Sequence, residues 1–284
     1  MHFPHIRQFH PIESHVPIAT APAEPRPLLL RNLTEQSAEF RHLLTHFLLP
    51  VELLVEHGID PITWKNKDGE VMVHVAHEGD VYGLRLLNDI DRRDPLIEVE
   101  MADTVFGRIE VTWIGVNDPN APRFDIDHTP DGHNTLRGTA ARNLQTEAAA
   151  LVAGLSPGQV RAGLRILPQL LADVEQFMAA MHQYEYEVEP LYYHNAILFE
   201  RAGFHYLRGR QMMERIHEGF APGGVLAQRL DNSSPFRRLE LANTIRGRSW
   251  AIHDGILDET WDGIKLVKRI GVKADVHTAP EVGW

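Results

Sequence analysis

The sequence predicts an α/β (α+β) fold class, with a mixed, mainly antiparallel sheet, flanking helices, and an extension at each end of the chain. Three patterns predict it. Apolar and polar residues alternate between about 70 and 127, a long apolar stripe at helical spacing lies between 156 and 181, and a strand, a helix and a strand follow. Hydrophobic residues make up 43% of the 284 residues, which is enough to bury a full-sized core.

The N-terminal part is expected to hold a flexible arm and then a helical segment. Residues 1–30 are rich in Pro and His, and a mobile tail is favoured over a metal-chelating role. In the helical segment, residues 31–69, Asn32 and Glu35 form a capping-box pattern, and helical spacing then continues to Pro50, where a helix ends or kinks. The histidines of the arm are His2, His5, His10 and His15.

An antiparallel meander is predicted to begin the next region, an α/β domain that spans residues 70–220. A turn cluster at 117–120 precedes a further short strand at 123–127. Residues on one face of the three main strands are Val71, Val73 and Val75, then Ile97, Val99 and Met101, then Ile109, Val111 and Trp113.

The clearest helix start is at Ser156, which suits the N-cap, with Pro157 at the first helical position and Gln159 completing a capping box. The apolar stripe continues in phase from there to Met181. Pro168 is therefore expected to kink this helix without ending it.

Shorter elements complete the domain. They are a strand at 182–188, a helix at 194–202, an extended segment at 204–207 and a helix at 210–218. A loop-rich extension, residues 221–284, is expected to pack on the same domain and to contain a final strand at 263–270.

Composition excludes several classes of function. The chain has no Cys, which excludes disulfides, thiolate nucleophiles and Cys-ligated metals. A net charge of −11 argues against a nucleic-acid partner, because such binding relies on Lys and Arg. No membrane-spanning stretch or leader is evident, so we expect a cytoplasmic protein with a small-molecule substrate and no membrane partner; a homo-oligomer stays open.

Two motifs resemble the second half of the GNAT family of N-acetyltransferases. One is Gln159-Val160-Arg161-Ala162-Gly163-Leu164, and the other runs from Glu189 to Phe204 and includes Asn195-Ala196 and Phe199-Glu200-Arg201-Ala202-Gly203-Phe204. The resemblance covers roughly residues 124–207. In that family, a glycine-containing loop leads into a helix whose backbone amides hold the coenzyme A pyrophosphate.

The resemblance implies that acetyl-CoA or another acyl-CoA is the cofactor. It assigns Gln159, Arg161, Gly163 and Asn195 to cofactor binding. Several positions depart from the family pattern. Ala162 and Leu164 occupy glycine-type positions of the loop, and Phe199 replaces the tyrosine that often serves as general acid. Counted back from Phe199, neither Asn195 nor Ala196 falls in the family register. A divergent or inactive N-acyltransferase is therefore as compatible with the motifs as an active one.

Acyl transfer to a small amine needs a base for the ammonium group and a proton donor for the leaving thiolate. Asp127 lies at the end of the predicted strand that would border the acceptor, and Tyr193 and His194 lie where a strand gives way to a helix. We expect Asp127 or His194 to be the base, because histidine is easily tuned to titrate near neutrality, and Tyr193 to be the acid.

Two other classes of function remain as alternatives. A metal-dependent enzyme could use the loop from Asp125 to His133, whose donors are Asp125, Asp127, His128, Asp131 and His133, with His194, His205, His253 and Asp254 as further candidates. A non-catalytic binding protein could line a pocket with Trp113, Tyr184, Tyr186, Tyr192 and Tyr193. In either case Arg246 and Arg248 could hold an anion or a carboxylate.

Overall fold

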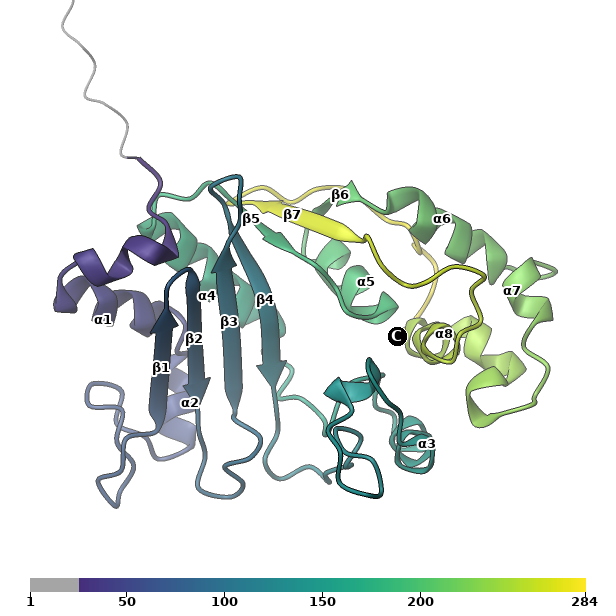
Figure 1. Cartoon of the computed structure of the whole chain (residues 1–284), viewed down its shortest axis with the longest axis horizontal. Helices are drawn as coiled ribbons and strands as arrows, with labels where there is room; N and C mark the ends of the chain where they lie inside the picture. The colour runs from purple at the N-terminus through teal and green to yellow at the C-terminus, as the bar shows by residue number, and fades with distance from the viewer. Residues whose placement is uncertain (1–25) are drawn as a thin grey trace, which may run out of the picture.

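The computed structural model describes residues 26–284, in which a seven-stranded sheet has the strand order β1-β2-β3-β4-β5-β7-β6 (Figure 1). Every neighbouring pair is antiparallel except β4 and β5. The predicted fold class is confirmed. The strands are β1 (Val73–Glu78), β2 (Val81–Leu86), β3 (Ile97–Asp103), β4 (Ile109–Val116), β5 (Glu185–Val188), β6 (His205–Arg208) and β7 (Lys265–Arg269).

Helices flank the sheet and fill the long connections between strands (Figure 1). The α-helices are α1 (Ala38–Phe47), α2 (Val51–Glu56), α3 (Leu144–Val152), α4 (Leu167–Ala180), α5 (Tyr193–Arg201), α6 (Arg210–Gly219), α7 (Val225–Gln228) and α8 (Ile245–His253). Short 3-10 helices are η1 (Leu30–Glu35), η2 (Leu136–Gly138), η3 (Pro235–Arg237) and η4 (Leu239–Asn243).

The parallel pair β4–β5 divides the sheet into two antiparallel parts. Its ladder has three residue pairs, from Ile109 with Tyr186 to Val111 with Val188. Beyond them β5 ends, while β4 continues to Val116, and Figure 1 shows the two strands diverging. A shift in the register between β3 and β4 falls at the same place, because Glu100 pairs with Trp113 and Met101 pairs with Val111. Two parallel strands need a long crossover, which here contains α4.

One large core joins the sheet to the helices and to the end of the chain. The apolar face of α4 contributes Leu170, Val174, Phe177 and Met178 to it. Residues 221–284 add several side chains to this same core. Those side chains are Leu226, Leu230, Ile245, Ala251, Ile252, Ile256, Ile264, Leu266, Ala279 and Val282.

A second, smaller core lies under the connection between β4 and α4. It joins residues of that connection to Phe236 and Trp250 from the C-terminal part of the chain. The Trp250 indole donates a hydrogen bond to the Leu155 carbonyl at 2.8 Å. The residues that the connection contributes are Ile126, Ala150, Leu155 and Val160.

The predicted helix start at Ser156 is wrong. Residues 156–166 are irregular, and α4 begins at Leu167, with Pro168 in its first turn and not at a kink. The capping pattern forms a local turn instead, because the Ser156 amide donates to Gln159 Oε1 at 2.7 Å. Arg165 has φ +62°, which a continuous helix would not allow. Proline at the start of a helix is favoured, since no intrahelical donor is lost there.

Other differences from the sequence prediction are local. Residues 123–127 form no strand, and Arg123 lies at the centre of an ion-pair cluster described below. The helix predicted from Asn32 begins later, where the Ser37 hydroxyl accepts a hydrogen bond from the Phe40 amide at 3.1 Å. β2 and α3 were not predicted. The predicted arm, residues 1–30, lies mostly outside the described residues, as do its four histidines.

Replacing Pro168 by Ala should change the free energy of unfolding by less than about 1 kcal/mol, because a first-turn proline blocks no helical hydrogen bond. A proline inside a longer helix would cost about 3 kcal/mol, so its removal would stabilise the protein by that amount. Urea denaturation distinguishes the two cases. Ala172→Pro, at an exposed interior position of α4, is the control and should lose about 3 kcal/mol or more.

Candidate functional site

Three of the four residues predicted to bind the cofactor, Gln159, Arg161 and Gly163, lie between the carboxyl end of β4 and the start of α4, whereas Asn195 lies in α5. Gln159 and Gly163 belong to the irregular segment 156–166. A Cβ atom on Gly163 would lie 2.9 Å from the carbonyl oxygen of Val116 in β4, so only glycine fits without a shift. The loop before α4 is thus held directly against the end of β4.

Free amides mark the start of α4. Among the described residues, the backbone N–H groups of Leu164, Arg165 and Ile166 donate to no protein acceptor, and the N-cap Ile166 offers no side-chain cap. The Arg165 side chain is exposed beside them. An uncapped helix start carries unpaired donors and the positive end of the helix dipole, which together suit an anion.

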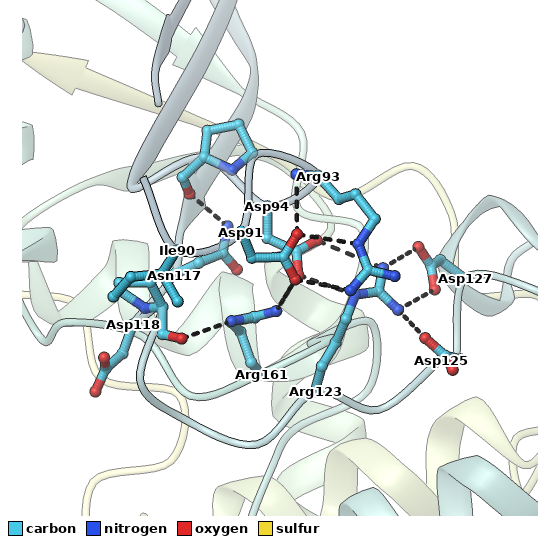
Figure 2. Close-up of polar contacts among 12 residues, drawn as sticks. Ile90, Asp91, Arg93, Asp94, Asn117, Asp118, Arg123, Asp125, Asp127 and Arg161 are labelled. Atoms are coloured by element: carbon cyan, nitrogen blue, oxygen red, sulfur yellow. Dashed lines mark hydrogen bonds and ion pairs between the residues drawn. The ribbon is translucent and has the colours of Figure 1, made fainter. Parts of the chain in front are cut away.

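Arg161 is turned away from this loop and is buried (Figure 2). Its Nη2 lies 2.9 Å from Asp91 Oδ2 and 2.7 Å from Asp94 Oδ2, and its Nη1 donates to the Pro119 carbonyl at 3.1 Å. Two carboxylates therefore compensate its charge, and the geometry gives Arg161 an anchoring role.

Arg123 extends the same cluster to Asp127, the first of the two predicted bases (Figure 2). Its guanidinium contacts Asp127 Oδ2 at 2.6 Å and Asp94 Oδ2 at 2.9 Å, and it also pairs with Asp125. Although burial alone would raise the pKa of Asp127, its bond to Arg123 lowers that pKa. Asp127 is therefore held as a carboxylate and is a poor proton acceptor.

The loop from Asp125 to His133 does not gather its donors around one point. Asp125 and Asp127 both bind Arg123, and the exposed Asp131 carboxylate lies 3.2 Å from His133 Nε2. Within residues 26–284, no three His, Asp or Glu side chains are grouped so that they could hold a metal ion. The metal hypothesis gains no support from these positions.

Tyr193, His194 and Asn195 form the first turn of α5, which follows β5. Within residues 26–284 the buried Tyr193 hydroxyl makes no hydrogen bond of normal geometry, although Arg248 lies near it; burial raises its pKa more than Arg248 lowers it, so it stays protonated. His194 Nδ1 lies 2.9 Å from Ser249 Oγ. Burial, with smaller contributions from the charges of Arg246 and His253, lowers the pKa of His194 to about 3, so the imidazole is neutral.

A group of side chains that sequence analysis did not connect surrounds this turn. The Tyr192 ring stacks on His194 with 5.7 Å between ring centroids and meets the edge of His253 at 5.5 Å. His253 Nε2 lies 3.4 Å from the buried Glu147, which Arg142 also holds at 2.5 Å. Glu147 lies on α3, and the sequence of α3 does not indicate that this helix contacts His253 of α8.

Arg137 links β4 to the start of α5. Its guanidinium stacks on the Trp113 ring at 4.5 Å, and its carbonyl accepts a 2.5 Å hydrogen bond from the Tyr192 hydroxyl. Gly158 packs against the same tyrosine, because a Cβ there would lie 2.4 Å from the ring. The connection between β4 and α4 therefore contacts both β4, through Trp113, and the start of α5, the helix that follows β5.

Two cavities lie elsewhere. One of about 520 Å³ lies between α1 and the β1–β2 hairpin and includes His42, Trp64 and Tyr82 in its lining. The other, of about 510 Å³, lies at the surface of residues 232–240. Neither has a lining residue from β4, β5, α4 or α5.

Comparison of the chain with known protein families, with curated proteins and with solved structures finds no match. Among the helices of residues 26–284, none is both long and apolar enough to span a bilayer.

Arg161→Met should lower the free energy of unfolding by about 3 kcal/mol, because it leaves the buried Asp94 and the partly buried Asp91 short of one partner. Arg93→Met is the matched control. It removes an Asp91 partner that is 70% exposed, and its effect on the free energy of unfolding should be far smaller than that of Arg161→Met. Urea titration of both variants measures this, and equal losses would contradict an anchoring role for Arg161.

Stability should fall in acid as the carboxylates of this cluster protonate. The hydrogen bond from Arg93 lowers the pKa of Asp91, and the pKa of Asp127 is also lowered, so both folded values lie below the unfolded value of about 3.9. The unfolded state then binds more protons as pH falls through this range. The unfolding free energy should be nearly level above about pH 5 and should decline below about pH 4. Asp127→Asn should make that decline less steep in urea titrations at several pH values. An unchanged dependence of the unfolding free energy on pH would contradict a contribution from Asp127.

Proposed function

We propose that the protein is an acyl-coenzyme A-dependent N-acyltransferase that acts on a small amine. The observation that carries the proposal is the divergence of the parallel strands β4 and β5 next to the uncapped start of α4. The motif resemblance at residues 159–164 and 189–204 supports the same cofactor.

The edge of β4 offers a place for an extended chain. Its ladder with β5 ends at Val111, so on that edge no strand of residues 26–284 pairs with the residues from Thr112 to Val116. Coenzyme A has an extended arm with two amide groups, and such an arm can pair with a free strand edge as an added strand does. Its pyrophosphate would then meet the free amides before α4.

The chemistry requires the amine nitrogen to attack the thioester carbonyl carbon. The carbon–sulfur bond then breaks, the ammonium proton passes to a base, and the thiolate takes a proton from an acid. Tyr193 suits the acid, because its hydroxyl is protonated and makes no hydrogen bond within residues 26–284. Of the two predicted bases we favour His194, since Asp127 is paired with Arg123, whereas burial is the main cause of the lowered pKa of His194 and is relieved when its cover is displaced.

Access to these side chains needs a movement of the chain. Tyr193 and His194 are 1% and 4% exposed, so a substrate reaches them only if part of their cover is displaced. If this movement did not occur, the protein would bind the cofactor without turnover, as a divergent, inactive N-acyltransferase would.

Isothermal titration with acetyl-CoA in buffer containing EDTA tests the proposal. We expect micromolar binding, and Arg165→Glu should weaken it about tenfold or more, because it places a carboxylate beside the proposed pyrophosphate position. Arg208→Glu makes the same charge change at an exposed site on β6 and should bind as the wild type does. Absence of heat at several temperatures, or equal weakening in both variants, would overturn the proposal.

Tyr193→Phe should lower turnover about 100-fold without lowering the melting temperature, because it removes a proton donor that makes no hydrogen bond within residues 26–284. Release of free coenzyme A thiol measures turnover. Tyr186→Phe is the control, since it removes the other buried tyrosine hydroxyl that has no partner, on β5. A Tyr193→Phe variant as active as Tyr186→Phe would exclude Tyr193 as the acid.

A further inference from the structure

Two imidazoles of α1 face each other beside a cavity. His42 and His46 are one helical turn apart, and their Nε2 atoms lie 3.1 Å from one another. Within residues 26–284, no other two imidazoles are in contact through their ring nitrogens. His42 is exposed and lines the cavity of about 520 Å³ between α1 and the β1–β2 hairpin. Solutes can therefore reach the pair.

The separation of 3.1 Å suits two nitrogen atoms that bind one cation. An imidazole nitrogen without a hydrogen carries a lone pair, so two such nitrogens that face each other repel unless a proton or a metal ion bridges them. Zinc–nitrogen bonds of about 2.0–2.1 Å place two ligand atoms about 2.9 Å apart at a right angle and about 3.3 Å apart at a tetrahedral angle. The distance between the two Nε2 atoms lies between these values.

Trp64 holds both rings in place from outside α1. Its ring stacks on His42 with 4.3 Å between centroids and lies 5.1 Å from His46. Trp64 has φ +55°, which is uncommon for a bulky residue. Its backbone fixes this conformation, because its amide donates to the Asp60 carbonyl and its carbonyl accepts from the Met72 amide, each at 2.8 Å. Rings that are ordered in advance lose less entropy when they bind an ion.

The protonation state of the pair also suits a metal ion. Burial, and then the charge of His42, lower the pKa of His46, so its ring is neutral at pH 7. The neutral ring is the form that binds a metal, because a proton would occupy the lone pair. The net charge of −11 raises the concentration of cations around the chain.

Two protein ligands leave part of the coordination sphere open. Among residues 26–284 no three His, Asp or Glu side chains are grouped to hold a metal ion, so no third such ligand joins the pair from this part of the chain. Sites with open positions accept water or an exchangeable ligand, whereas structural sites are closed. Because His42 lines the cavity, we expect the open positions to lie at its border.

We propose that His42 and His46 chelate one divalent transition-metal ion at the border of the cavity between α1 and the β1–β2 hairpin. Imidazole ligands suit zinc, nickel and copper, whereas magnesium and calcium prefer oxygen. The proposal does not depend on acyl transfer. The titration with acetyl-CoA is carried out in EDTA, so its outcome is independent of this site.

Calorimetric titration of the metal-free full chain with zinc chloride tests the site. His42→Gln and His46→Gln should each weaken zinc binding at least about tenfold, since loss of even a hydrogen-bond partner of a metal ligand costs about 10- to 100-fold in affinity. His74→Gln, the control, removes an exposed imidazole on β1 and should bind as the wild type does. Magnesium chloride should give no heat of binding. Absence of zinc binding, or equal weakening in His74→Gln, would overturn the proposal.

The N-terminal segment has histidines of its own, so its contribution is measured separately. A full-length arm variant, with all four of these histidines replaced by Gln, should still bind zinc, and His42→Gln should still weaken the binding. If the arm variant binds no zinc, the segment supplies the ligands and the α1 site is wrong. The four residues are His2, His5, His10 and His15.

Stability gives an independent measurement. His42 is exposed and His46 only partly buried, so replacing either one should change the melting temperature of the metal-free protein little. An ion that binds the folded pair stabilises the fold, so saturating zinc should raise the melting temperature of the arm variant. The same zinc should not do so when His42→Gln is added. An equal rise in both would show that zinc acts elsewhere and would exclude the site.

Copper(II) chloride locates the ion through Trp64, one of five tryptophans. A bound copper(II) ion quenches the fluorescence of an indole at short range, and the Trp64 ring contacts His42. One equivalent should lower the tryptophan emission of the arm variant. Trp64→Phe keeps an aromatic ring beside His42 and should lose most of this quenching, and His46→Gln should lose it with Trp64 in place. Quenching that is unchanged in both would place the ion beside another tryptophan and contradict the site.

Discussion

The arrangement of the candidate site depends on the ion pairs that the buried guanidinium of Arg161 forms with Asp91 and Asp94. This guanidinium joins Asp91 and Asp94, in the connection between β2 and β3, to the loop that runs along the end of β4. The connection from β4 to α4 is long and mostly irregular, and it has a small core of its own. The ion pairs of Arg161 add to that core in holding the loop before α4 against the connection between β2 and β3.

Much of the fold could be predicted from the sequence, because it depends on local periodicity. Alternation gave three of the four strands of the meander, and the strand–helix–strand pattern after residue 181 gave β5, α5 and β6 in the right order. The start of α4 could not be predicted, since Ser156 and Gln159 satisfy each other in a turn as well as they would in a helix. Periodicity carries no information about where the chain takes a left-handed residue such as Arg165.

The candidate site was harder to predict, because its important properties are differences between similar residues. Arg161 and Arg246 look alike in the sequence, yet one is paired with two aspartates and the other with none in the described residues. In the same way, Asp127 and His194 are both reasonable bases until Arg123 and burial distinguish them. Charge compensation depends on tertiary contacts, and neither spacing nor composition reports it. For Arg246 the sequence offered one indication, since Arg246 and Arg248 form a local concentration of positive charge in an acidic chain.

The short ladder between β4 and β5 also has a consequence for how the chain folds. Strands β1 to β4 pair with their sequence neighbours, so their contacts close small loops and can form early. The three pairs of β4 with β5 join residues on either side of the whole β4–α4 connection and α4, and closing that loop costs more entropy. The meander is therefore able to form before the remaining strands, and the boundary between the early and the late part of the sheet coincides with the candidate site.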